Sequence, residues 1–414
     1  MKLKKLSMGI GDRFGHQGKA QLAAFIQAQK QGVSITPVWN KSNREHTLIG
    51  TQPPSVRLEA DQAVAALGWT GAYHVDADHI NLKTVDGFIP CCDFFTLDVA
   101  DYIGKTPDAA ELAAFVKANE RFVGKLEISG IDQTFTITHD TIEQIGRTFL
   151  FAVVETGKIY RRIESHKGKG HFIVEVSMDE SERAQSPLEM LFILSAIAQQ
   201  GIPAQTIAPK FTGRFNKGVD YVGDVAQFEK EFCADIAVIQ YAVKTFGLPD
   251  TLKLSVHSGS DKFSIYAPIN KALKTLNAGL HLKTAGTTWL EELIGLAEAG
   301  GEGLAIAKDI YAEALKKFDD MCAPYATVID IDKSKLPKPE TVKAWNGSEY
   351  AAALRHDPAC KHFNPHFRQL LHVGFKVAAQ MGRRYLDALQ ANEAVVAKHV
   401  TENILDRHIR RVFY

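Results

Sequence analysis

The stretch Ala72-Tyr73-His74-Val75-Asp76-Ala77-Asp78-His79 predicts a buried strand that ends abruptly in two carboxylates and an imidazole. Apolar and polar residues alternate over residues 72–75, as they do in strands, and Asn81 then begins a polar turn. Clustered acids are costly to bury unless a partner compensates their charge. A divalent cation is such a partner, with His79 as a ligand and Asp78 beside it as a proton-transfer group. A solvated turn that caps the next helix is the alternative interpretation.

Strand-like runs alternate with segments of helical periodicity through most of the chain, which predicts a parallel α/β sheet covered by helices. Between them, Ser186-Pro187-Leu188-Glu189 combines an N-cap, a first-turn proline and a capping-box glutamate. Eight such units in order favour a (β/α)8 TIM-type barrel over a doubly wound sheet, and no Gly-x-Gly-x-x-Gly follows the first strand. The predicted strands are residues 6–10, 35–39, 72–75, 94–97, 172–177, 206–208, 252–256 and 281–283.

Two segments of the chain are not accounted for by eight minimal strand–helix units. We expect residues 1–300 to form the catalytic barrel, including a helical insertion at residues 101–170 after the fourth strand, which is a candidate lid. Residues 301–414 are predicted to form a helical C-terminal extension that packs on the barrel or builds a subunit contact, and they offer surface for a homo-oligomer.

Composition narrows the class of protein. The chain has 414 residues, and lysine plus arginine equal aspartate plus glutamate at 48 each, so no charge excess indicates a nucleic-acid partner. No apolar run approaches the ~20 residues of a membrane span, and no signal peptide is evident. Five cysteines without CxxC spacing suit a reducing compartment. We therefore expect a soluble cytoplasmic protein that acts on a small molecule.

Reactive groups of such barrels lie at the carboxyl ends of the strands, and polar residues gather at all eight predicted ends. His257 follows the seventh strand directly, and Glu175 lies inside the apolar fifth strand, where a lone carboxylate requires a compensating charge. His281 is a ligand candidate only if the last strand begins near Leu276; a start at Leu280 turns it toward the barrel's bottom. The candidates for binding substrate are Asp12, Arg13, Asn40, Lys210, Asp261, Lys262 and Lys283.

Taken in order, several motifs resemble the tagaturonate epimerase family, bacterial enzymes that interconvert tagaturonate and fructuronate in hexuronate breakdown. There is also a local similarity to class II metal-dependent aldolases, which place Asp-His after a barrel strand. That similarity fails after the sixth strand, where Lys210 stands instead of a histidine. The motifs are Gly9-Ile10-Gly11-Asp12-Arg13-Phe14-Gly15, Val75-Asp76-Ala77-Asp78-His79, Phe94-Phe95-Thr96-Leu97-Asp98, Glu175-Val176-Ser177-Met178-Asp179-Glu180, His257-Ser258-Gly259-Ser260-Asp261-Lys262-Phe263 and His281-Leu282-Lys283-Thr284-Ala285-Gly286-Thr287.

The resemblance implies a divalent metal, an acid/base pair and inversion of a carbinol two bonds from a ketone. A retro-aldol cleavage followed by re-addition to the other aldehyde face accomplishes that inversion. Asp78 is then expected to act as base and Glu175 as conjugate acid, and Lys283 or Lys210 to bind the carboxylate. The expected metal ligands are His79, His257 and either His281 or Glu175, and the donors suit Zn²⁺, Mn²⁺, Co²⁺ or Ni²⁺.

Three other functions remain open from the sequence. A class II-type sugar aldolase would release three-carbon fragments, and a ketose isomerase would introduce solvent deuterium beside the ketone. The substrate is a sugar acid, or a neutral or phosphorylated ketose. A non-catalytic sugar-acid sensor is the third alternative, and the presence of every candidate ligand and acid/base residue argues against it.

Overall fold

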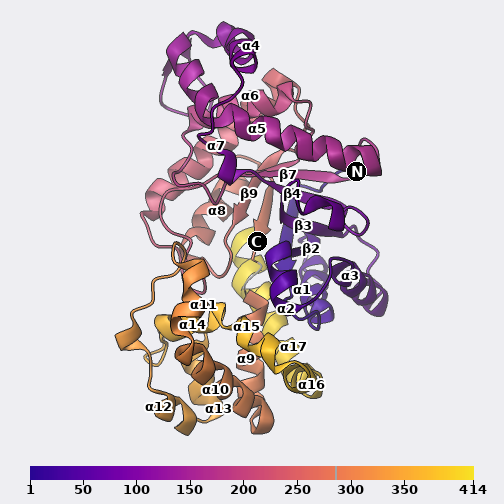
Figure 1. Ribbon diagram of the computed structural model, residues 1–414, viewed down its shortest axis with the longest axis vertical. Helices are drawn as coiled ribbons and strands as arrows, with labels where there is room; N and C mark the ends of the chain where they lie inside the picture. The colour runs from indigo at the N-terminus through magenta and orange to yellow at the C-terminus, as the bar shows by residue number, and fades with distance from the viewer. Residues whose placement is uncertain (285–286) are drawn as a thin grey trace.

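Eight parallel strands close into a barrel in the order β1-β10-β9-β8-β7-β4-β3-β2, which confirms the predicted TIM-type fold (Figure 1). The computed structural model describes residues 1–284 and 287–414, so residues 285–286 of the last quoted motif lie outside the described residues. The barrel strands are β1 (Leu6–Gly11), β2 (Thr36–Ser42), β3 (His74–Ile80), β4 (Phe94–Asp98), β7 (Ile173–Ser177), β8 (Thr206–Ala208), β9 (Lys253–His257) and β10 (Leu280–Lys283).

Helices cover the outside of the barrel after every strand except β3, which is joined to β4 through a single 3-10 turn, Val85–Gly87. The capping box predicted from the sequence is present, because the Ser186 side chain accepts from the Glu189 amide and Glu189 reaches back to Ser186. The covering helices are α1 (Gly18–Lys30), α2 (Asn43–Ile49), α3 (Pro54–Leu67), α5 (His139–Lys167), α6 (Pro187–Gln199), α7 (Val225–Phe246), α8 (Phe263–Thr275) and α9 (Thr287–Ala299).

The insertion between β4 and β7 contains a short helix, a two-stranded hairpin and the long helix α5 that covers the barrel. Its outer part projects at one end of the molecule's long axis (Figure 1). Ser195 of α6 donates a 2.7 Å hydrogen bond to Asn119 of the insertion. The predicted helical insertion after the fourth strand is therefore present. Its remaining elements are α4 (Ala109–Asn119), β5 (Gly124–Leu126) and β6 (Phe135–Ile137).

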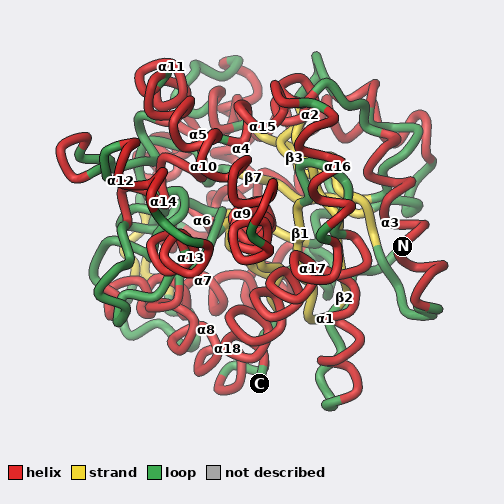
Figure 2. Tube along the Cα trace, turned by 90° about the horizontal axis from the view of Figure 1, so that it is seen from below, coloured by secondary structure: helices red, strands yellow, loops and turns green. Residues whose placement is uncertain are grey.

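The C-terminal helices form the other end of the molecule and pack on α1, α8 and α9 of the barrel. Figure 2 shows that end, with the helices of the extension in front of the strands. Gly295 of α9 permits a close approach, because a Cβ there would stand 2.7 Å from the Val396 Cα. The elements are α10 (Gly301–Lys316), α11 (Phe318–Cys322), α12 (Pro339–Ala344), α13 (Gly347–Leu354), α14 (Pro365–Val373), α15 (Phe375–Met381), α16 (Arg383–Ala391), α17 (Glu393–Glu402), a π-helical segment Asn403–Ile409, and α18 (Arg410–Phe413).

The barrel interior changes from apolar to charged along its axis. Near the amino-terminal ends of the strands, Phe94 packs against the imidazole of His281 with ring centroids 5.2 Å apart. Closer to the carboxyl ends, three fully or almost fully buried residues (Asp76, Glu175 and Lys283) form an ionic layer. In the described part of the chain, no helix is both long and apolar enough for a membrane crossing.

Candidate metal and substrate site

A β-bulge near the end of β3 brings His79 to the barrel mouth. Between Ala77 and Ile80 the chain of β3 advances three residues while β4 advances from Phe95 to Leu97, so one residue is extra. His79 adopts φ 51°, in the left-handed region that few residues other than glycine enter. The strand also continues through Asp76 and Asp78 to Ile80, beyond the predicted end at Val75.

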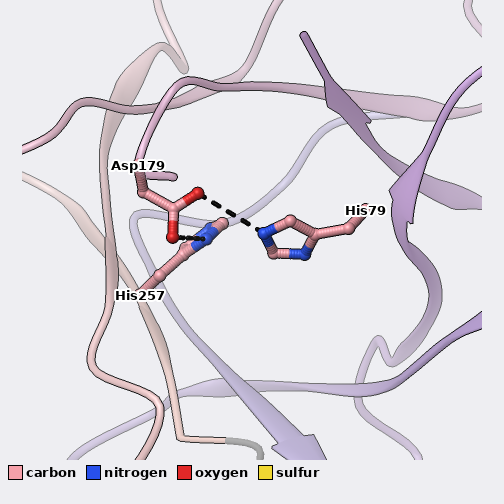
Figure 3. Close-up of side chains that lie close together, drawn as sticks. All are labelled: His79, Asp179 and His257. Carbon is pink, nitrogen blue, oxygen red and sulfur yellow. Dashed lines mark hydrogen bonds and ion pairs between the residues drawn. The ribbon is translucent and has the colours of Figure 1, made fainter. Parts of the chain in front are cut away.

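Three side chains converge at this mouth: His79 near the end of β3, Asp179 in the loop after β7 and His257 at the end of β9 (Figure 3). One ligand atom from each lies within 4.8 Å of the others. Asp179 Oδ1 is 3.4 Å from His79 Nε2, and Asp179 Oδ2 is 3.1 Å from His257 Nδ1. We call these three residues the triad.

Each triad histidine also contacts a carboxylate through its other ring nitrogen. Asp78 Oδ1 lies 3.0 Å from His79 Nδ1, and Glu175 Oε1 lies 2.7 Å from His257 Nε2. Carboxylates placed in this way orient imidazoles that bind metal ions and make them better ligands. Asp78 and Glu175, which the sequence suggested as base and acid, therefore occupy positions that orient the two imidazoles.

Lys283 links the orienting carboxylates. Its ammonium lies 2.8 Å from Asp76 Oδ2, 2.8 Å from Asp78 Oδ1 and 3.0 Å from Glu175 Oε1, and it also donates to Thr96. An ammonium has three protons to donate, and these oxygens take all of them. Lys283 is therefore not available to bind a substrate carboxylate, although it is one of the residues lining the cavity described below.

The charges around the triad shift several pKa values. Burial lowers the pKa of His257, but Asp179 and Glu175 outweigh it and raise the pKa to about 9. Burial likewise opposes protonation of His79, and the neighbouring Asp78 and Asp179 raise its pKa well above the ordinary value. Without a metal ion, both rings are therefore protonated near neutral pH and paired with carboxylates.

A cavity of about 250 Å³ opens over the triad and adjoins a second cavity of about 580 Å³, and seven residues line both. None of the described residues that line the two cavities belongs to the insertion at 101–170, so the insertion does not act as a lid over them in this structure. The first cavity is lined by Arg13, Ser42, Arg44, Glu45, Asp78, His79, Asp98, Asp179, Glu180, Lys217, His257, Gly259, Lys283, Tyr325, His372 and Phe375.

His281 does not join the triad. β10 begins at Leu280, the case in which the sequence analysis placed this residue at the barrel's bottom. Its Nδ1 lies 2.9 Å from Ser7 Oγ, and burial lowers its pKa to about 3, so the ring is neutral. Asp179, which follows β7, occupies the third position of the group instead of His281 or Glu175.

Asp261 and Lys262, predicted to bind substrate, lie outside both cavities. Asp261 is fully buried and pairs with Arg368 at 2.9 Å, with His356 and His408 also in contact. The Lys262 ammonium donates to Ser260. The Asp261 contacts join the loop after His257 to the C-terminal extension, and the Lys262 contact lies within the loop, so both residues stabilise the loop rather than face a ligand.

Of the other residues predicted to bind substrate, two line a cavity and two make structural contacts. Arg13 lines the first cavity and Lys210 the second. Asp12 accepts hydrogen bonds from the backbone amides that follow it, which shapes the loop after β1. Asn40 is buried beside Gly9, where a Cβ would stand 2.8 Å from its Nδ2 and 2.8 Å from Lys283 Cγ.

Sequence reasoning missed several residues of the site. Asp98 ends β4 and Asp179 follows β7, where functional residues are expected, but no feature of the sequence singled out either one as a metal ligand or a proton-transfer group. Tyr325, His372 and Phe375 come from the C-terminal extension, whose histidines gave no pattern that indicates a site. The extension thus completes the wall of the cavity.

The triad fits a divalent cation. Two imidazole nitrogens and one carboxylate form a donor set found in zinc and other transition-metal sites. His257 Nδ1 is buried and has no well-aligned hydrogen-bond partner in the described part of the chain, although it faces Asp179. A cation would satisfy this nitrogen, and the orienting carboxylates already occupy the opposite nitrogens.

Comparisons with known proteins show which family and fold the chain resembles over its length. The family model described as tagaturonate epimerase (UxaE) matches residues 1–412. A tagaturonate/fructuronate epimerase of Thermotoga maritima is 28% identical over 425 residues, covering 97% of this chain and 80% of that protein. Crystal structures of the fructuronate-tagaturonate epimerase UxaE from Cohnella laeviribosi share the fold, covering 100% of this chain and 82% of theirs. The glycerol complex has TM-score 0.82 and the native structure 0.81, each at 22% identity.

Proposed function

Because the chain belongs to the tagaturonate epimerase family and is thus an isomerase-class enzyme, we propose that it interconverts tagaturonate and fructuronate with a bound divalent cation. The observation that carries the proposal is the convergence of two imidazoles and a carboxylate within 4.8 Å at the mouth of the barrel. The cavity over them is of a size that suits a sugar acid or ketose.

His79 Nε2, His257 Nδ1 and Asp179 would bind the cation, and Asp78 and Glu175 would keep the two imidazoles in place. When bound, a cation supplies Lewis-acid stabilisation of the negative charge that develops on the substrate's ketone. The donor set suits Zn²⁺, Mn²⁺, Co²⁺ and Ni²⁺ alike.

Asp98 is the side chain that we assign to proton transfer. It lines the cavity beside His79, and burial together with Glu180 and Asp179 raises its pKa, with His79 opposing the rise. Lys283 and His79, by contrast, outweigh burial and lower the pKa of Asp78, which makes Asp78 a weak proton acceptor. A group whose pKa moves toward the working pH transfers protons more efficiently.

In the proposed reaction Asp98 takes the proton of the hydroxyl on the carbon that lies two bonds from the ketone carbon. The bond between that carbon and the carbon beside the ketone breaks, and its electron pair forms the double bond of an enediolate, while the deprotonated carbinol becomes an aldehyde. The aldehyde rotates inside the cavity, the enediolate re-adds to its other face, and Asp98 returns the proton. The walls keep both fragments together, so recombination is effectively intramolecular.

Metal affinity is expected to rise with pH. The pKa of His257 is about 9 in the metal-free protein, against an ordinary value of 6.5. Protonation of His257 therefore stabilises the metal-free protein fully below about pH 6.5, and this stabilisation is lost as the pH rises through 9. A metal ion must displace the proton below pH 9. We expect affinity to increase about tenfold or more per pH unit up to that point and then to level off.

Competition with a chelator of known affinity, on dialysed protein from about pH 6.5 to about pH 9.5, measures this dependence. Since the pKa of His79 is also raised, a slope steeper than one proton per metal is consistent with the site. An affinity independent of pH would rule out the two imidazoles as the groups that exchange protons for metal.

The function is tested by incubating purified, metal-loaded protein with fructuronate and with tagaturonate in deuterated water and following both by NMR. We expect each to convert into the other without solvent deuterium in the product, because the proposed route breaks no carbon–hydrogen bond. Deuterium beside the ketone would indicate an isomerase, and accumulating three-carbon fragments would indicate an aldolase. No conversion of either uronate would refute the proposal.

A further inference from the structure

Three cations line the cavity apart from Lys283, and they come from three separate segments at the barrel mouth. Arg13 follows β1, Arg44 lies in α2, and Lys217 lies between β8 and α7. The ion pairs around the triad use none of them. Neither metal binding nor proton transfer therefore accounts for the presence of these three cations in the cavity.

Arg13 is the most buried of the three. Its side chain is only 8% exposed, and its guanidinium lies over the ring of Phe375, 4.3 Å from the ring centroid. Nε is 3.2 Å from Glu45 Oε1, yet neither Nε nor Nη1 has a well-formed hydrogen bond within the part of the chain described. Buried donors without acceptors are costly, so this guanidinium is arranged for an acceptor that the protein itself does not supply.

Unlike Arg13, which pairs with Glu45, Lys217 and Arg44 have no ion-pair partner among residues 1–284 and 287–414. The Lys217 ammonium reaches the turn after His257, since a Cβ on Gly259 would stand 3.4 Å from Nζ. Burial lowers the pKa of Lys217 and Glu180 opposes this, which indicates an ammonium partly removed from water. Arg44 lies near the Tyr325 ring at 5.5 Å and is more exposed.

The lysines that the sequence suggested for a substrate carboxylate are less well placed. Lys283 is fully used by Asp76, Asp78 and Glu175. Lys210 lines only the second cavity. Neither contributes a free cation to the cavity over the triad.

We propose that Arg13 and Lys217, with Arg44 at the rim, form a carboxylate subsite that binds the acid end of the substrate while its ketone end faces the triad. Arginine suits this task because its fork of N–H groups matches a carboxylate. Glu45, Asp98 and Glu180 line the same cavity, so the three cations face three carboxylates outside the triad and the Asp78–Lys283 pair. With no surplus of positive charge, the subsite favours a singly charged carboxylate over a phosphate dianion.

This inference rests on the proposed function for the identity of the ligand, and it is tested by binding. Dissociation constants are measured by calorimetry for fructuronate and for the ketose that carries a hydroxymethyl group in place of the carboxylate. We expect the wild-type protein to prefer the acid, and Lys217→Met and Arg13→Met each to reduce that preference about ten- to a hundredfold. Arg13→Lys is expected to fall between wild type and Arg13→Met, because it keeps the charge without the fork.

Lys83→Met is the matched control, since Lys83 is exposed on the loop after β3 and lines neither cavity. It should leave the preference unchanged. An unchanged preference in both cavity variants would overturn the subsite, as would tighter binding of a phosphorylated ketose than of the uronate. If Arg13→Met fails to fold, Lys217→Met decides alone.

These dissociation constants, together with the NMR assay of interconversion, separate this inference from the proposed function. A protein that binds uronates through these cations without interconverting them loses the function and keeps the subsite. If the protein interconverts the uronates but neither Arg13→Met nor Lys217→Met changes its preference for the acid over the neutral ketose, the proposed function stands and the subsite is refuted.

Discussion

Replacing His257 with alanine is expected to remove the bound metal and to lower kcat at least about a thousandfold, since the Lewis acid contributes several kcal/mol to the reaction. The substitution deletes one of three donors in the triad and leaves Asp179 facing His79 alone. Elemental analysis of the purified variant measures the first effect, and NMR-monitored turnover of fructuronate measures the second.

Two further variants serve as comparisons for His257→Ala. Glu175→Gln keeps all three donors and removes the carboxylate charge that orients His257 and pairs with Lys283, so metal affinity should fall about 10- to 100-fold without disappearing. His281→Gln alters a ring that contacts Ser7 and Phe94 below the triad, so metal content should stay at one ion per chain. Metal retained in His257→Ala and lost in His281→Gln would reverse the ligand assignment.

Asp98→Asn is expected to lower kcat about 10²- to 10⁴-fold while metal content stays at the wild-type level. The amide has nearly the same shape as the carboxylate and can still accept from the Ala100 amide, but it cannot take a proton from the substrate. Because the pKa of Asp98 is raised, wild-type kcat/KM should fall on the acid side of its profile as this carboxylate is protonated.

That acid limb should be absent from the profile of Asp98→Asn. Asp78→Asn serves as the comparison: it removes a carboxylate that pairs with Lys283 and His79, so it should weaken metal binding as well as turnover. If Asp98→Asn keeps kcat within about tenfold of wild type, the proton is transferred by another group, and Glu180 is the next carboxylate in the cavity.

The barrel could be predicted because each strand–helix unit leaves a local pattern that needs no tertiary information. The same local patterns placed His79 and His257 at strand ends, and the structure brings their rings to within 5.1 Å between centroids. The bulge that turns His79 toward Asp179 could not be predicted, because it depends on how β3 pairs with β4. His281 depended on where β10 begins, and a shift of a few residues moves a side chain to another layer of the barrel.

The contribution of the C-terminal extension could not be predicted from the sequence. Residues 367–389 have the pattern of one helix, but Gly374 and Gly382 divide this part of the chain into α14, α15 and α16. His372 and Phe375 stand on either side of the first break and reach the cavity. Such placement follows from the packing of many helices, which no periodicity in a single segment encodes.

Anomalous X-ray diffraction from crystals of the purified protein, recorded at the absorption edge of the metal that elemental analysis identifies, tests the central claim most directly. We expect a single strong peak about 2.0–2.2 Å from His79 Nε2, His257 Nδ1 and an oxygen of Asp179. A peak bound elsewhere, or fully active crystals without any peak at the triad, would contradict the account.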